Sequence, residues 1–218
     1  MDLRITKYIS ISGGHVKLNG NLVYSADGPA GSDLLKQVYR HFGYTYPKFF
    51  KMDNLSKLGF LSSEILLSNT EIKEKYSSER VGIILLNSSS SLETDEKHQE
   101  SISDRDNYFP SPSVFVYTLA NIMAGEMAIR HKLRGENSVF VFEQFEPEFI
   151  YDYIRNIFEL NKVGCLLGGW VESYHERQES FLFLVEQSSP SNSGRQAGEN
   201  IIFDAKSLSR LFNESVLK

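Results

Sequence analysis

The chain has 218 residues, 41% hydrophobic and 23% charged, ordinary values for a globular protein that buries about 70% of its extended surface. The net charge is -5 and no Lys/Arg cluster stands out, so the basic patch typical of nucleic-acid binding is missing. No run approaches the ~18 apolar residues of a membrane span. The single cysteine excludes an internal disulfide framework and a thiolate zinc cluster. The first residues lead into strand-like sequence rather than a secretion signal, so we expect a cytoplasmic protein.

The N-terminal region predicts strands followed by two helices. Residues 5–24 alternate weakly between apolar and polar, with Gly13-Gly14 as a turn, which indicates a hairpin or a bent pair of strands. Ser32 or Asp33 can cap a short helix. Asp53 can cap a second helix, whose leucines and isoleucines follow a helical period.

The middle of the chain predicts a strand, a loop and a helix. Residues 80–87 contain a continuous apolar run, typical of a strand that is buried on both faces in a parallel sheet. Residues 88–112 are polar and contain four consecutive serines and two prolines, which predicts a long loop. Helical spacing from Ser113 to Leu133 then predicts one helix, with Gly135 ending it.

A strand and a helix follow, joined by a sharp turn. Residues 138–142 read as a second buried strand, and Pro147 suits the first position of a helix, with Glu146 in its N-cap region. The apolar period of that helix stops at Asn161-Lys162. The turn at 142–148 is the place where α/β folds position a nucleophile or bind an anion.

The last third predicts strands at residues 163–171, 181–186 and 201–203, with a polar loop at 187–199 and an amphipathic helix at 205–216. Strands that alternate with helices, several of them continuously apolar, indicate an α/β layered fold.

Three blocks, in this order and spacing, carry a resemblance to a known family. They are the proline-flanked segment 110–135 with its Asn-x-x-Ala-Gly core, the strand and turn 138–146, and the segment 164–172 with Gly-Gly-Trp-Val-Glu. Together they resemble the N-terminal half of β-ketoacyl-acyl carrier protein synthases, of the thiolase-like superfamily. Val81–Asn87 and Lys51–Gly59 are similar to the family's early Val-Gly strand and to its entry into the first long helix.

The resemblance, strongest over residues 45–186, implies a thiolase-like layered fold of the N-terminal half only. We therefore expect a mixed sheet packed by helices and a single domain over residues 1–218. In the family, the turn delivers a catalytic cysteine. Counting back from Gly168-Gly169 places that position at Glu143 or Gln144, and neither can form a thioester.

Other catalytic groups of the family are missing as well. Its two catalytic histidines lie in the C-terminal half, which this chain lacks, and the five histidines here match no family position. His131 lies near a helix end, where favourable electrostatics with the C-terminus explains it. The one cysteine, Cys165, falls inside a strand, where a free cysteine is typically a small buried hydrophobe.

Two features of the turn, its glutamine and its carboxylates, can each be interpreted as functional or as structural. Some chain length factors, which resemble the synthases but lack the cysteine, carry Gln at this position; otherwise Gln144 is a polar turn residue that satisfies backbone groups. The carboxylates of Glu143, Glu146 and Glu148 have no companion His or Asp at ligand spacing. We therefore predict neither a metal site nor a cofactor.

The resemblance implies a non-catalytic, chain length factor-like subunit that pairs with an active β-ketoacyl synthase, or with itself, and works with an acyl carrier protein. It is similar to short relatives from aryl polyene and flexirubin-type pathways, within bacterial fatty acid and polyketide-like biosynthesis. The alternatives are a 3-oxoacyl-acyl carrier protein synthase or acyltransferase that uses partner residues, and a plain scaffold. The candidate interface and acyl-pocket residues are Phe115, Leu119, Met123, Val139, Val141 and Phe145.

Overall fold

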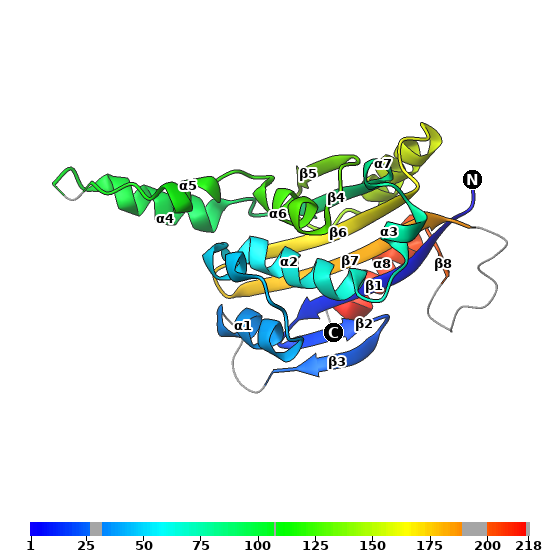
Figure 1. Cartoon of the computed structure of the whole chain (residues 1–218), viewed down its shortest axis with the longest axis horizontal. Coiled ribbons are helices and arrows are strands. Elements are labelled where there is room, and N and C mark those ends of the chain that lie inside the picture. Colours follow the sequence, from blue (N-terminus) through cyan, green and yellow to red (C-terminus); the bar gives the residue numbers. More distant parts are fainter. Residues whose placement is uncertain (27–31, 107, 189–199, 217–218) are drawn as a thin grey trace.

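In a computed structural model of the chain, which describes residues 1–26, 32–106, 108–188 and 200–216, eight strands form one mixed sheet (Figure 1). The strands are β1 (Leu3–Ser12), β2 (His15–Leu18), β3 (Asn21–Ser25), β4 (Val81–Asn87), β5 (Asn137–Val141), β6 (Cys165–Tyr174), β7 (Arg177–Gln187) and β8 (Ile201–Ile202). The helices are α1 (Ser32–His41), α2 (Asn54–Leu67), α3 (Ile72–Lys75), α4 (Leu92–Ser103), α5 (Pro112–Val116), α6 (Ile122–His131), α7 (Pro147–Glu159) and α8 (Ala205–Ser215). Two 3₁₀ helices span Pro47–Lys51 and Ser78–Arg80.

The strand order is β3-β2-β1-β7-β6-β4-β5, and β8 pairs with β1. The strands β5, β4 and β6 are parallel, whereas β6, β7, β1, β2 and β3 pair antiparallel in turn. The predicted fold class, a mixed α/β sheet packed by helices, is therefore confirmed. Because β5, β4 and β6 are parallel, the carboxyl ends of all three strands lie at the same end of the sheet, called here the carboxyl edge.

Each face of the sheet has its own hydrophobic core. Helices α1, α2 and α6 contribute to one core, and α7 and α8 contribute to the other. Figure 1 shows α2 in front of the sheet and α8 behind it. As predicted, Asp53 caps α2, where its Oδ1 accepts a 2.9 Å hydrogen bond from the backbone amide of Ser56.

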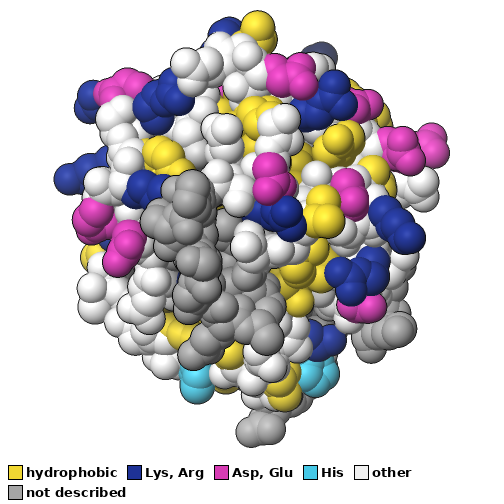
Figure 2. All heavy atoms as spheres, turned by 90° about the vertical axis from the view of Figure 1, so that its right-hand side faces the viewer, with side chains coloured by type: hydrophobic (Ala, Val, Ile, Leu, Met, Phe, Trp, Pro, Cys, Tyr) yellow, Lys and Arg dark blue, Asp and Glu magenta, His cyan; other side chains and the backbone are white. Residues whose placement is uncertain are grey.

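Charges are mixed on the end of the molecule that Figure 2 shows. Lys and Arg side chains lie beside Asp and Glu side chains around this face, with hydrophobic side chains between them. Among the described residues of this face, charges of both signs therefore alternate, in keeping with the modest net charge of -5.

The structure confirms one predicted buried strand and corrects the other. Every residue of β4 is buried, as the continuous apolar run indicates. In contrast, β5 lies at the edge of the sheet, and the side chain of Val141 is 54% exposed. The expectation that 138–142 is a second buried strand is wrong: β4 is its only partner among the described strands, and none of the residues of β5 is buried.

The expectation of a single helix at 113–133 is also wrong, because the structure has two helices there, α5 and α6. Between them, the amide of Tyr117 donates to the carbonyl of Val114, three residues back, in a turn that is tighter than an α-helical turn. The carbonyl of Thr118 accepts a 2.8 Å hydrogen bond from Ser91 Oγ. At the other end, Lys132 in the left-handed conformation (φ 59°) terminates α6, three residues before Gly135.

The long loop expected at 88–112 contains a helix, α4. Its residues are mostly polar and only Thr94 is buried, so the apolar period that reveals a helix is missing. Acidic residues in its first turn, Glu93 and Asp95, favour a helix start there.

The structure confirms the predicted start and end of α7 but extends the predicted N-terminal hairpin. Helix α7 begins at Pro147 after Glu146, and Asn161 follows its end with φ 53°, as predicted. The predicted N-terminal hairpin is a three-stranded unit. The predicted caps of α1, Ser32 and Asp33, instead lie within its first turn. Most of the predicted loop at 187–199 lies outside the described residues.

Candidate functional site

The strand, turn and helix expected at 138–148 are present. Strand β5 ends at Val141, the chain turns through residues 142–146, and α7 begins at Pro147. The amide of Phe142 donates a 2.9 Å hydrogen bond to the carbonyl of Asn87, the last residue of β4. The turn is thus fixed to the carboxyl edge of the parallel strands, where α/β sheets place their sites.

The side chains of this turn have two different environments. Glu143 and Gln144 are exposed, and Gln144 Nε2 donates to Glu146 Oε1 at 3.2 Å, a side-chain carboxylate rather than a backbone group. Phe145 is buried, and its ring stacks on Phe212 of α8 with 4.6 Å between centroids. The turn therefore presents a carboxylate and a carboxamide to solvent at the two positions where we expect a nucleophile from the sequence resemblance.

Behind the turn, a buried carboxylate orders the loop that follows β4. Glu172, near the end of β6, is fully buried, and its Oε2 accepts hydrogen bonds from the amides of Ser88 (2.6 Å) and Ser89 (3.0 Å). The Oε1 atom of Glu172 and the Oδ1 atom of Asn87 are buried without a partner among the described residues. In the sequence, Glu172 is visible only as the end of Gly-Gly-Trp-Val-Glu, and its loop partners lie more than 80 residues away.

The free edge of β5 is the second part of the site. Val139 and Phe140 are half-buried and Val141 is exposed, so the edge is partly apolar. An edge strand presents unpaired backbone N–H and C=O groups, which another strand can pair with.

The third part is an arm that extends beyond the sheet, formed by residues 92–106 and 108–119, and called here the apolar arm (Figure 1). Its helices α4 and α5 lie against each other, and the rings of His98 and Phe115 are 5.4 Å apart. The arm's large exposed apolar side chains are Leu92, Tyr108, Phe109, Phe115, Val116 and Leu119. Exposed apolar groups that gather in this way are typical of interaction surfaces.

Polar contacts fix the base of the apolar arm to the body. Thr94 Oγ1 donates to Asp53 Oδ2 at 3.2 Å, and Tyr174 OH donates to Glu96 Oε1 at 2.9 Å. Burial is the main cause that raises the pKa of Asp53. The arm therefore has a defined position relative to α2 and the sheet.

The structure separates the six candidate interface and acyl-pocket residues. Phe115 (54% exposed) and Leu119 (50%) lie on the apolar arm, and Val141 lies on the edge of β5. Val139, also on β5, is half-buried and packs against the core on the α2 side. Met123 is buried in the core on the α2 side, whereas Phe145 is buried in the core on the α7 side. Because these cores lie on opposite faces of the sheet, Met123 and Phe145 do not line a common cavity.

Cys165 and His131 are both buried. Burial raises the pKa of the Cys165 thiol, and the nearby Glu186 carboxylate acts in the same direction. His131 Nε2 lies 3.0 Å from Ser63 Oγ, and burial lowers the pKa of His131 to about 4, an effect that the Glu64 carboxylate only partly offsets. The expectation of favourable helix-end electrostatics for His131 is therefore wrong, because its ring is neutral near pH 7.

Within the part of the chain that the structure describes, no three His, Cys, Asp or Glu side chains gather as metal ligands. Over the same residues, no helix is both long and apolar enough to cross a membrane.

Comparison of the sequence with family models and with curated proteins finds no match. Solved structures share the fold. The ishigamide ketosynthase/chain length factor matches with a TM-score of 0.63 at 17% identity, over 88% of this chain and 64% of that chain. A ketosynthase in complex with its chain length factor from Xenorhabdus doucetiae matches with a TM-score of 0.54 at 13% identity, over 87% and 81%.

A third match is a type II polyketide ketosynthase in complex with its acyl-carrier protein, with a TM-score of 0.56 at 13% identity, over 85% of this chain and 62% of that chain. The chain thus spans under two thirds of the length of two of these structures. At these identities the likeness shows the fold alone: the mixed sheet packed by helices that these ketosynthase and chain length factor structures share.

Proposed function

We propose that this chain is a non-catalytic ketosynthase-like subunit, similar to chain length factors, that pairs with an active β-ketoacyl synthase. The observation that carries the proposal is the exposure of Glu143 and Gln144 in the turn after β5. The family resemblance places the nucleophile's position at one of these two residues, and neither can form a thioester.

Condensation requires a nucleophile that accepts the acyl group and donors that stabilise the developing oxyanion. The chain's one thiol, Cys165, lies in β6 rather than in the turn, and it is fully buried with a raised pKa. A buried, protonated thiol is a poor nucleophile. These features support a structural role for this chain within a pair.

The partner surface that we propose combines the free edge of β5 with the apolar arm. Stable protein interfaces bury about 1,600 Å² in total, mostly around apolar anchors. Phe115, Leu119 and Val141 supply such anchors on this side of the sheet. An active synthase is the proposed occupant, supported by matched structures in which a ketosynthase is paired with a chain length factor; a second copy of the chain is the alternative.

We also propose that an acyl carrier protein contacts the pair. One matched structure holds a ketosynthase with its acyl-carrier protein. On this chain, Lys51, Lys57 and Lys97 line a cavity of about 200 Å³ beside α2 and the apolar arm; Asp53 lines it too, and Lys97 is ion-paired with Glu93. The small surplus of positive charge would favour the approach of an acidic partner. A pathway of the aryl polyene or flexirubin type rests on the family resemblance alone.

Co-expression with candidate full-length synthases, followed by sedimentation analysis, tests the pairing. We expect Val141→Lys to weaken association by several kcal/mol, because the contact would bury an unpaired charge. Leu22→Lys is the matched control: Leu22 is similarly exposed (57%) but lies on β3, at the opposite edge of the sheet. A wild-type chain that is monomeric and ignores every synthase contradicts the proposal.

A measurement of condensing activity is the second part of the test. The isolated chain, incubated with acyl- and malonyl-loaded carrier protein, is expected to form no β-ketoacyl product. Product from the isolated chain would refute the non-catalytic role even if the pairing were found.

A further inference from the structure

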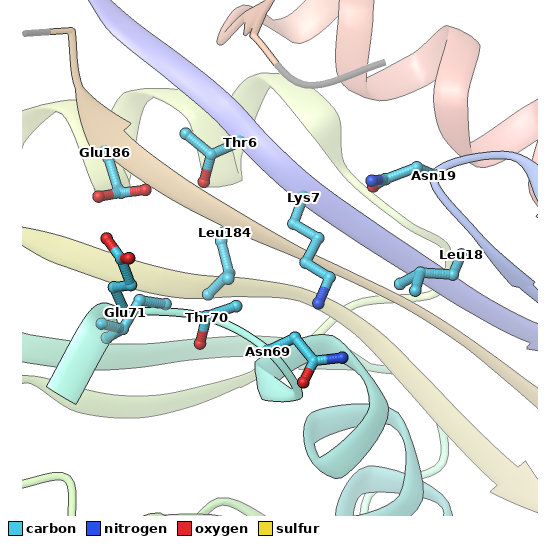
Figure 3. A pocket seen from close by; sticks show the side chains of 10 residues that line it. Thr6, Lys7, Leu18, Asn19, Asn69, Thr70, Glu71, Leu184 and Glu186 are labelled. Atoms are coloured by element: carbon cyan, nitrogen blue, oxygen red, sulfur yellow. The ribbon is translucent and has the colours of Figure 1, made fainter. Parts of the chain in front are cut away.

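The surface around α3 has cavities of two kinds. The larger cavity, about 430 Å³, lies between β1, β7 and the segment that links α2 to α3 (Figure 3). Lys7 lines it together with the carboxylates of Glu71 and Glu186, so its lining favours neither sign of ligand charge. Two smaller cavities also lie beside α3, and every charged residue in their lining is a lysine.

The two smaller cavities adjoin each other, and together they are called here the paired cavity. The apolar half, about 150 Å³, is lined by Leu67, Thr70, Ile72, Lys73 and Leu133. The lysine half, about 200 Å³, has Lys73, Tyr76, Val81, His131, Lys132 and Leu133 in its lining. Because Lys73 and Leu133 line both halves, an elongated molecule can occupy both, with its two ends in different surroundings.

Two lysines give the lysine half its charge. Lys73 comes from α3, and Lys132 directly follows α6. Both side chains are exposed, and neither ammonium has a hydrogen bond or an ion pair among the described residues. An ammonium only donates hydrogen bonds, so two of them in one cavity favour an anionic group.

The other cations nearby are already bound to carboxylates. Lys75 Nζ lies 2.5 Å from Glu186 Oε1, and Arg130 donates to both carboxylate oxygens of Glu64, at 2.7 and 2.9 Å. Glu74, the chain neighbour of Lys73, is exposed and lines neither half of the paired cavity. The carboxylates around the lysine half therefore leave Lys73 and Lys132 to a ligand.

The wall of the lysine half is fixed by packing. The ring of Tyr76 lies against the backbone of Gly164, where an added Cβ would be 2.6 Å from Tyr76 Cδ1. The hydroxyl of Tyr76 donates to Glu186 Oε1 at 3.0 Å. On the other side, the left-handed backbone of Lys132 (φ 59°) separates two buried residues that both line the cavity, His131 and Leu133.

We propose that the paired cavity binds a small amphipathic anion, a carboxylate or a phosphate monoester that carries a short apolar chain. The anionic group lies between Lys73 and Lys132, and the chain extends past Leu133 toward Leu67 and Ile72. Transfer of the chain from water to these side chains adds to the affinity.

The paired cavity is distinct from the turn and from the proposed partner surface. Val81, in its lining, is the first residue of β4, so the cavity lies at the amino end of the parallel strands. The turn and the apolar arm follow the carboxyl ends of β5 and β4. This site goes beyond the proposed pairing function and does not rest on it.

Calorimetry and NMR on the full chain test the site, with hexanoate and hexyl phosphate as probes. We expect at least one of them to saturate and to shift the ring signals of His131, while the other four histidines, which lie outside the lining, do not respond. Acetate, which lacks the chain, and 1-hexanol, which lacks the charge, should each bind at least about tenfold more weakly.

Variants of the two lysines provide the second part of the test. Lys73→Met should weaken binding by about tenfold, because a charge-assisted hydrogen bond is lost. Lys206→Met, at an exposed position of α8 outside the paired cavity, is the matched control and should bind as the wild type does.

Lys132→Gly removes the second ammonium, and glycine accepts a φ of 59° without strain, so this variant tests the site even if Lys73→Met fails to fold. Its affinity should fall severalfold. Asn69→Gly, also at a left-handed position (φ 52°) but outside the paired cavity, controls for the added backbone freedom. The proposal is overturned if neither hexanoate nor hexyl phosphate saturates by about 10 mM, if acetate or 1-hexanol binds as tightly as they do, or if Lys132→Gly retains wild-type affinity.

Discussion

The carboxylate of Glu172, in strand β6, accepts a 2.6 Å hydrogen bond from the backbone amide of Ser88, in the loop that follows β4. The same oxygen accepts from Ser89, and the carbonyl of the adjoining Asn87 accepts from Phe142 in the turn. The buried carboxylate, the loop after β4 and the turn after β5 are thus connected at the carboxyl edge of the parallel strands.

We expect Glu172→Ala to destabilise the chain by about 3 kcal/mol, because two partly buried amides lose their acceptor. Urea unfolding measures the loss, and hydrogen exchange at the Ser88 and Ser89 amides should accelerate. Glu148→Ala, at an exposed position of α7, is the control and should change stability by less than about 0.5 kcal/mol. Unchanged exchange at Ser88 and Ser89 would show that Glu172 does not order the loop.

The second prediction concerns Gly169 in β6. Its φ is +152°, and an added Cβ would lie 2.0 Å from the carbonyl oxygen of Phe181 on β7. We expect Gly169→Ala to cost about 3 kcal/mol or more, because backbone rather than a flexible side chain must move. At Gly125 in α6 an added Cβ meets nothing within 4 Å, so Gly125→Ala should be neutral or stabilise by up to about 1 kcal/mol. Equal melting temperatures of the two variants would contradict this assignment.

Several elements could be predicted from the sequence because their signals are local. The continuous apolar run of β4 and the Pro147 start of α7 are set by neighbouring residues, and both are confirmed. The edge position of β5 and the break between α5 and α6 could not be predicted, because they depend on which strand lies alongside and on a bond from Ser91 to the Thr118 carbonyl.

The candidate site, like the fold, could be predicted from the sequence only in part. The turn at 142–146 follows from strand and helix signals in one segment. The role of Glu172 depends on its burial in β6 and on two amides more than 80 residues away in the sequence. No periodicity in a single sequence encodes that contact.

The third prediction concerns Cys165, which we expect to be structural. Its thiol is fully buried and its pKa is raised, so a thiol reagent should react slowly with the native chain and rapidly in denaturant. Labelling followed by mass spectrometry gives both rates on one sample. Rapid labelling of the native chain would place the thiol in reach of solvent.

The last prediction is a loss of stability in acid that originates at His131. Burial lowers its pKa from 6.5 to about 4, and the charged groups that act on it are Glu64, Lys73 and Arg130. The unfolded chain therefore binds a proton near pH 6.5, while the folded chain binds it only near pH 4. Between these values the unfolded state holds more protons, so the free energy of unfolding falls as the pH falls, by about 1.4 kcal/mol per pH unit and about 3 kcal/mol in all.

Chemical unfolding of the wild type and of His131→Gln from pH 7.5 to 4 isolates this contribution, because carboxylates elsewhere titrate in both proteins. Gln cannot take up a proton, so the variant should lose less stability over this range, even though it starts from a lower value at pH 7. His175, exposed in the turn between β6 and β7, provides the matched control, and His175→Gln should follow the wild-type curve. Parallel curves for wild type and His131→Gln would mean that His131 binds its proton equally well in the folded and unfolded states.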